Sequence, residues 1–154
     1  MNIDRSGPEP QPFAVGRVAF ALGFAGLLPQ AAAVALLLAG FPDSGFFIAL
    51  AYSALILSFL GGMWWGFAMQ RREGQAGLVA LAVLPSLVVL AILPLAMVRS
   101  GLGLIAMGAA ILLTLPIDRS LVTRGVAPTN WMRLRVPLSV GLGGLTIVAG
   151  LLVP

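Results

Sequence analysis

Long apolar runs constrain this chain more than any other feature of its sequence. The chain has 154 residues, and five apolar runs of about 17 to 25 residues follow one another with only short polar stretches between them. A hydrocarbon core of about 30 Å needs about 20 helical residues, because each residue advances a helix by about 1.5 Å. Backbone groups that meet lipid have to bond within their own helix or within a closed barrel. Unbroken runs of this length favour helices.

The sequence therefore predicts an all-α polytopic membrane helix bundle with five transmembrane helices. We expect one membrane domain at residues 15–154, with spans at about 18–40, 45–69, 77–98, 101–117 and 136–153. Residues 1–14 are polar and rich in proline, which is typical of a flexible N-terminal arm and not of a signal peptide. Only 9% of all residues are charged, against about 25% in soluble domains, so a water-facing shell is excluded.

The arginines predict the orientation of the bundle. All nine basic residues are Arg, and the formal net charge is +4. They are scattered between apolar segments instead of gathered on one polar face, which argues against nucleic-acid binding. Arg99 alone falls on one side, and an excess of Arg marks the cytoplasmic side, so we expect the N-terminus inside and the C-terminus outside. The arginines on the inner side are Arg5, Arg17, Arg71, Arg72, Arg119, Arg124, Arg133 and Arg135.

Residue types limit the chemistry. The chain has no Cys and no His, which removes thiolate nucleophiles, thiol-rich zinc sites, axial haem histidines and the usual proton shuttle. Glu73 and Asp118 offer carboxylates near a predicted surface, but they are about 45 residues apart and have no His or Lys support. We interpret Asp118 as a helix-end charge or an ion pair with Arg119. We expect no catalytic residue, no metal, no cofactor and no enzyme activity; ion-coupled transport is also disfavoured, because the predicted spans contain no ionisable residue.

Small residues recur every four positions along the second span. They form one ridge on a helix, and the last two make a Gly-x-x-x-Gly pair that lets another backbone approach closely. We expect this ridge to pack within the chain, and leave contact with a partner chain or with a ligand as alternatives. The ridge residues are Ala54, Ser58, Gly62 and Gly66.

Tryptophans next to arginines predict two anchors at the membrane surface, because indole rings favour the headgroup level and arginines the water beyond it. The first anchor follows the second span, and the second is a short interfacial helix before the last span, lying against anionic headgroups. Trp64 and Trp65 point about 100° apart, so one of the two rings should face the bundle. The anchors are Trp64, Trp65, Arg71, Arg72, Trp131, Arg133 and Arg135.

Polar residues at membrane depth are expected to face other helices, since an amide or hydroxyl facing lipid would lack a partner. Gln30 follows Pro29, where we expect a kink in the first span. The third span carries both Pro85 and Pro94, which predicts two kinks or a division into short pieces. The candidates for intramembrane polar contacts are Gln30, Tyr52 and Ser86.

Four segments together resemble the transmembrane protein 69-like family, a domain of unknown function in bacteria and mitochondria. They are GFAGLLP at residues 23–29, FLGGMWWG at residues 59–66, LPSL at residues 84–87, and the segment from Asp118 to WMRLR at residues 131–135. In that family the position of Trp64 is often basic or His, so the indole is a departure. The resemblance implies a five-helix bundle in an inner membrane, here the bacterial one, and brings no activity or catalytic residue.

Two functions remain after these exclusions. The first is an accessory or assembly subunit of a larger membrane complex, suggested by the small-residue ridge and the short loops. The alternative is a binder or carrier of a lipid or small apolar molecule, suggested by the prolines and polar groups within the spans. The expected partners are a bilayer with anionic headgroups and other membrane subunits.

Overall fold

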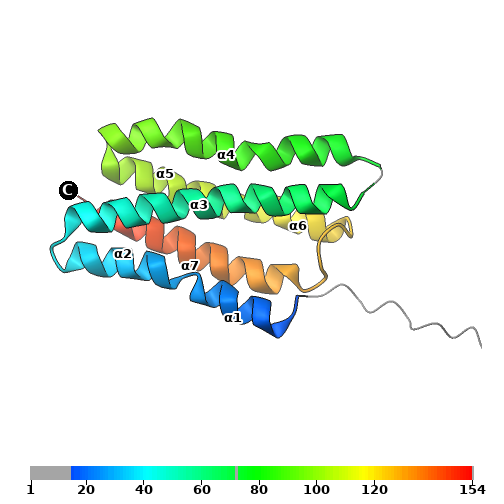
Figure 1. Ribbon diagram of the computed structural model, residues 1–154, viewed down its shortest axis with the longest axis horizontal. Helices are drawn as coiled ribbons and strands as arrows, with labels where there is room; N and C mark the ends of the chain where they lie inside the picture. The colour runs from blue at the N-terminus through cyan, green and yellow to red at the C-terminus, as the bar shows by residue number, and fades with distance from the viewer. Residues whose placement is uncertain (1–14, 72, 154) are drawn as a thin grey trace, which may run out of the picture.

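The computed structural model describes residues 15–71 and 73–153, so the predicted arm and Arg72 lie outside the described part. Every regular element in that part is a helix (Figure 1). The helices are α1 (Arg17–Ala25), α2 (Leu28–Leu38), α3 (Pro42–Met69), α4 (Gln75–Val98), α5 (Ser100–Leu113), α6 (Leu115–Thr123) and α7 (Trp131–Leu152).

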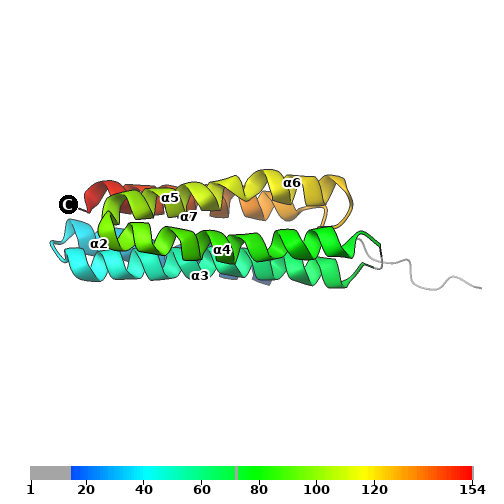
Figure 2. The same cartoon turned by 90° about the horizontal axis from the view of Figure 1, so that it is seen from above.

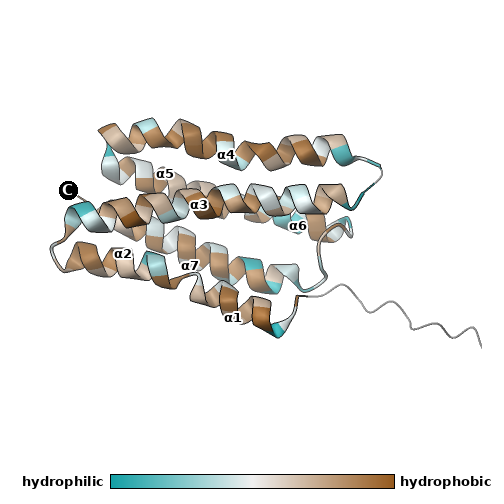
Figure 3. Ribbon diagram, viewed as in Figure 1, coloured by the Kyte–Doolittle hydropathy of each residue, from teal (hydrophilic) through white to brown (hydrophobic). Residues whose placement is uncertain are grey.

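These helices form five segments that are long and apolar enough to cross a membrane, which confirms the expected class and number of spans. Two segments consist of two consecutive helices: α1 with α2 over Arg17–Leu38, and α5 with α6 over Ser100–Thr123. Helices α3 and α4 lie side by side in one layer, and α5, α6 and α7 form a second layer (Figure 2). Apolar residues predominate along the helices (Figure 3), and many large ones are exposed on the outside of the bundle.

The first span breaks where the sequence predicts a kink. Helix α1 ends at Ala25, and α2 starts at Leu28 with Pro29 in its first turn, where the missing N–H of proline does no harm. The carbonyl of Gly26 at the break accepts a hydrogen bond from the Tyr52 hydroxyl of α3. A polar contact with the second span thus satisfies a backbone group freed at membrane depth.

The fourth span is longer than the sequence suggested. The sequence predicts an end at residue 117, before the polar segment, but α6 continues to Thr123. Pro116 lies in the first turn of α6 and therefore begins a new helix after the break at Thr114 instead of ending the old one. As a result Asp118 lies inside the helical span and not at its end.

Helix α4 is continuous from Gln75 to Val98, so the expected division of the third span at its two prolines is wrong. Each proline removes one backbone hydrogen bond, which need not end a helix that its neighbours hold in place. Pro85 is buried against α3 at Gly61, where an added Cβ would meet the Pro85 ring and the Ala82 carbonyl. This close packing supports α4 at the first of its two prolines.

Glycines bring α5 and α7 together at two levels. A Cβ on Gly108 would lie 2.6 Å from the carbonyl oxygen of Gly143, and a Cβ on Gly150 would lie 2.6 Å from that of Gly101. The two backbones therefore approach more closely than any side chain permits. This seam was not predicted, because its glycines are seven residues apart and come from distant parts of the chain.

Candidate functional site

A buried carboxylate occupies the interior of the bundle where α3, α6 and α7 meet. Asp118 is 0% exposed. Its Oδ1 accepts hydrogen bonds from the indole Nε1 of Trp64 at 2.9 Å and of Trp131 at 3.2 Å. Its Oδ2 accepts from the Nε of Arg135 at 2.7 Å, which also makes this contact a salt bridge. Each oxygen of the carboxylate is therefore held by at least one donor.

Arg135 extends the cluster to a fourth partner. Its Nη2 donates to the Thr114 hydroxyl at 3.0 Å, and that hydroxyl donates in turn to the Ile111 carbonyl at 2.6 Å. A charge removed from water is costly unless it is paired and hydrogen-bonded, and both conditions hold here. We call Trp64, Thr114, Asp118, Trp131 and Arg135 the polar cluster. Its two charges cancel.

Local structure explains how the cluster forms. Thr114 and Asp118 are four residues apart across the α5–α6 break, and Trp131 and Arg135 are four residues apart on α7, so each pair shares one helical face. Arg135 lies four residues after the start of α7, about 6 Å along its axis. An edge-to-face contact with Phe67, with ring centroids 5.5 Å apart, supports the Trp131 ring from α3.

The structure corrects three of the predicted surface anchors. Trp64, Trp131 and Arg135 are buried in the polar cluster. The expected short interfacial helix is the first turn of α7, because the chain continues from Trp131 without a break. Their partner Asp118 is not paired with Arg119, whose side chain is exposed on the far side of α6.

The two adjacent tryptophans are divided between two environments. Trp64 is 1% exposed, whereas Trp65 is 43% exposed on the outside of α3. Successive helical residues point about 100° apart, so this separation follows from the helix itself. The predicted anchors Arg71 and Arg133 are exposed at the same end of the bundle, and Arg72 lies outside the described residues.

The predicted intramembrane polar residues have different environments. Gln30 is fully buried, and its Nε2 donates to the Thr146 hydroxyl of α7 at 2.9 Å. Tyr52 bonds to Gly26 at the break in the first span. Ser86 is exposed on the outer face of α4, and no hydrogen bond of its side chain is found within the described residues.

The predicted small-residue ridge turns away from the interior as it runs along α3. Ala54 and Ser58 are half-buried, but Gly62 and Gly66 are exposed, and a Cβ on either would meet no atom within 4 Å. Helix α3 packs inward through a neighbouring face instead, which includes Gly61. No other described helix packs against the ridge at Gly62 and Gly66.

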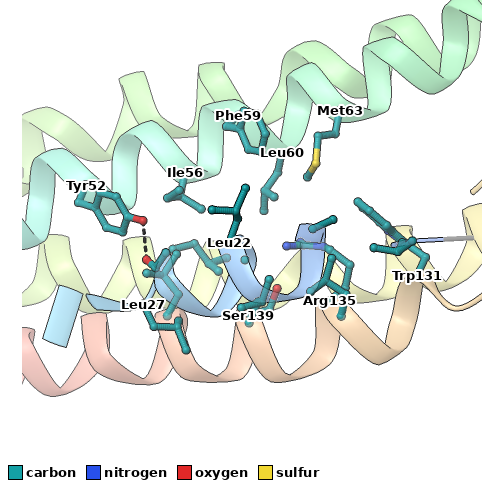
Figure 4. A pocket seen from close by; sticks show the side chains of 18 residues that line it. Leu22, Leu27, Tyr52, Ile56, Phe59, Leu60, Met63, Trp131, Arg135 and Ser139 are labelled. Carbon is teal, nitrogen blue, oxygen red and sulfur yellow. Dashed lines mark hydrogen bonds between the residues drawn. The ribbon is translucent and has the colours of Figure 1, made fainter. Parts of the chain in front are cut away.

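A groove of about 460 Å³ lies beside the polar cluster, between α1, α3 and α7 (Figure 4). It opens on the outside of the bundle, because Leu22 on one wall and Phe59 on the other are 69% and 60% exposed. Near one end Asn130 binds both backbone groups of Val15, at 2.7 and 3.0 Å, and so fixes the chain before α1 to the start of α7. Residues of the cluster and the groove overlap: Trp131 and Arg135 belong to both.

Most of the groove is apolar, and its size is typical of small-molecule sites, which span about 300–1,000 Å³. Tyr52, Arg135 and Ser139 bring polar groups to it. Its other lining residues are Val15, Ala19, Leu22, Gly23, Gly26, Leu27, Ile56, Phe59, Leu60, Met63, Ile111, Trp131, Leu134, Leu138 and Leu142. In residues 15–71 and 73–153, no group of three His, Cys, Asp or Glu side chains is close enough to hold a metal ion.

Sequence reasoning missed both the ion pair and the groove. The signal for the ion pair was present as two polar pairs at four-residue spacing, Thr114 with Asp118 and Trp131 with Arg135. The pairing was not recognised, because the predicted fourth span ends before Asp118. The groove had no comparable signal, because it depends on how far α1 stands from α3.

Comparison with known families identifies the chain. Residues 15–152 match the family described as "Protein of unknown function (DUF3429)". The chain belongs to the DUF3429 family. The match covers all seven helices, and therefore both the polar cluster and the groove. No curated protein and no solved structure shows significant similarity to the chain.

The two adjacent tryptophans provide a matched test of the polar cluster. Replacing Trp64 by Phe removes the indole N–H that Asp118 accepts, and hydrogen bonds to charged groups contribute about 1.5–3 kcal/mol. We expect Trp64→Phe to lower the free energy of unfolding by about that amount in mild detergent. Trp65→Phe, the exposed control, should change it by less than about 0.5 kcal/mol. Equal effects of the two substitutions would contradict the placement of the cluster.

Proposed function

We propose that this DUF3429 protein binds a lipid or small apolar molecule in the groove between α1, α3 and α7. The groove itself is the observation that supports this proposal: it is ligand-sized, mainly apolar and open to the outside of the bundle. A molecule dissolved in the bilayer would enter it sideways, past Leu22 and Phe59, without crossing water. The break between α1 and α2 (Figure 1) contributes to one wall, because Gly26 lines the groove.

We propose a non-enzymatic role for the protein. The buried charges of Asp118 and Arg135 are engaged with one another and with Trp64, Trp131 and Thr114, which is what a structural cluster requires. A general acid or base has to reach a substrate by hydrogen bonding, and both oxygens of Asp118 are directed to internal donors. This arrangement supports binding rather than proton transfer.

For the location, we propose the bacterial inner membrane, with the N-terminus in the cytoplasm and the C-terminus outside. The exposed arginines at the end shared by the α1 and α7 starts are Arg17, Arg71, Arg119, Arg124 and Arg133 among the described residues, whereas Arg99 lies at the opposite end. This distribution follows the positive-inside rule. We also propose kinship with the transmembrane protein 69-like proteins, which rests on the sequence motifs alone.

Contacts with anionic headgroups fit the same end. A second groove there is lined by Arg71 and Arg124, together with Ser120 and apolar residues of α4 and α6. Each arginine near an anionic surface contributes about 1 kcal/mol of attraction.

An accessory or assembly role in a larger membrane complex is the second candidate. Gly62 and Gly66 support it, because they leave a shallow strip on α3 where another helix could lie closely. The two proposals are compatible, since neither Gly62 nor Gly66 lines the groove.

Photolabelling tests the groove. A hexadecane analogue with a mid-chain diazirine, in mixed micelles with the full chain, should label Leu22, Phe59 and Leu138 saturably. Ala19→Phe fills the groove and should lower this labelling about tenfold, the effect of losing about 1.4 kcal/mol of affinity. The matched control is Ala21→Phe, on the exposed side of the same helix and outside the groove, which should leave it unchanged. Even labelling of outward residues such as Phe47 and Val98 would refute the binding role.

Substitution at the outer strip tests the accessory role. Gly62→Leu adds a side chain where no atom lies within 4 Å, so the chain should fold normally but lose any subunit that co-purifies through this strip at native expression levels. Gly108→Leu is the contrasting variant, because its Cβ would collide with the Gly143 carbonyl and should destabilise the bundle by about 1–3 kcal/mol or more. A partner retained by Gly62→Leu, or a chain that migrates without any reproducible partner, would rule out docking here.

A fusion experiment tests the orientation. Alkaline phosphatase joined after the C-terminus should be active, because the enzyme folds only outside the cytoplasm, and a fusion after Arg71 should be inactive. The reverse pattern would overturn the proposed topology.

A further inference from the structure

One polar group in the groove has no partner. Ser139 is 1% exposed, it lines the groove, and its Oγ makes no hydrogen bond with any described atom. A serine on a helix usually returns its hydroxyl to the carbonyl one turn earlier, and this one does not. An unpaired hydroxyl in an apolar site is costly, so the structure keeps a donor at this place at some expense to its stability.

Arg135 brings further donors to the same wall. It precedes Ser139 by four residues, one helical turn or about 6 Å, and both side chains line the groove from α7 (Figure 4). The hydrogen bonds of Arg135 to described residues use Nε and Nη2, whereas a guanidinium carries five N–H groups. Arginine donates and never accepts, so the group that best complements this wall is a hydrogen-bond acceptor.

The charge of the ligand follows from the salt bridge. Asp118 already neutralises Arg135 at 2.7 Å, so the wall of the groove has no net charge. A carboxylate or phosphate entering from lipid would bring an uncompensated charge into an apolar site, at a cost that one hydroxyl does not repay. A carbonyl oxygen accepts the same hydrogen bonds without that cost.

We propose that the groove selects a neutral long-chain molecule with a carbonyl acceptor, such as an ester, whose oxygen is bound by Ser139 beside Arg135 while its chain lies along α1 and α3. This inference rests on the proposed binding role, and adds the chemical class of the ligand. Gln30 Oε1 is the other buried side-chain atom without a partner among the described residues, but it is not part of the groove.

Competition against the diazirine-labelled hexadecane tests the selection. The competitors are methyl hexadecanoate, hexadecane and hexadecanoate ion at equal mole fraction in the micelle. Methyl hexadecanoate should compete about three- to tenfold better than hexadecane, the effect of one net hydrogen bond, and also better than the ion. Ser139→Ala should remove the advantage of the ester over hexadecane. The control Val140→Ala, on the exposed side of the same helix, should keep it.

The outcomes separate the two proposals. Saturable labelling of the groove with equal competition by ester and hexadecane would overturn the carbonyl selection and leave the binding role intact. An ester advantage that persists in Ser139→Ala would also overturn it, because the hydroxyl would not be the recognising group. Stronger competition by the ion would show a charged ligand instead. Absence of saturable labelling would refute the binding role itself.

Discussion

The structure depends on one buried carboxylate. Asp118 joins α3, α6 and α7, because its two carboxylate oxygens accept hydrogen bonds from Trp64, Trp131 and Arg135. Among the described residues, no other side chain is hydrogen-bonded to side chains of two other spans. In an apolar interior an unpaired charge is far more costly than in water, so these donors have to be in place whenever the bundle is folded. The contact thereby restricts the rotation of these three helices relative to one another.

The polar cluster and the groove are two sides of the same wall of α7. Trp131 and Arg135 reach inward to Asp118 and also line the groove, so the cluster orients the residues that a ligand would meet. Because the ion pair is neutral as a whole, it supplies hydrogen-bond donors without a field that attracts anions. The unpartnered hydroxyl of Ser139, one turn further along, is then the group through which a ligand would be distinguished from ordinary lipid tails.

Sequence patterns predicted the fold better than the site. Length and hydropathy gave five spans, and Pro29 marked the break in the first one, because these signals are local. The same local reasoning failed at Pro116, which starts α6 instead of ending the span, and at Trp131, which opens α7 instead of an interfacial helix. Both errors made the predicted spans too short at this end of the bundle, and so Asp118 and Arg135 were assigned to the surface. Hydropathy averages over a window and cannot recognise two opposite charges that cancel across 17 residues of sequence.

The sequence by itself determined that the chain is a bundle of five apolar helices, because runs of this length have no other way to satisfy their backbone in lipid. It also determined which residue types are available, and with them the absence of thiol and imidazole chemistry. Only the tertiary structure decided which face of each helix is inside. It turned Trp64 inward and Trp65 outward, left Gly62 and Gly66 uncovered, and placed Ser139 without a partner beside an open groove. Those choices follow from close contacts between segments distant in sequence, such as Gly108 against Gly143, which no local pattern encodes.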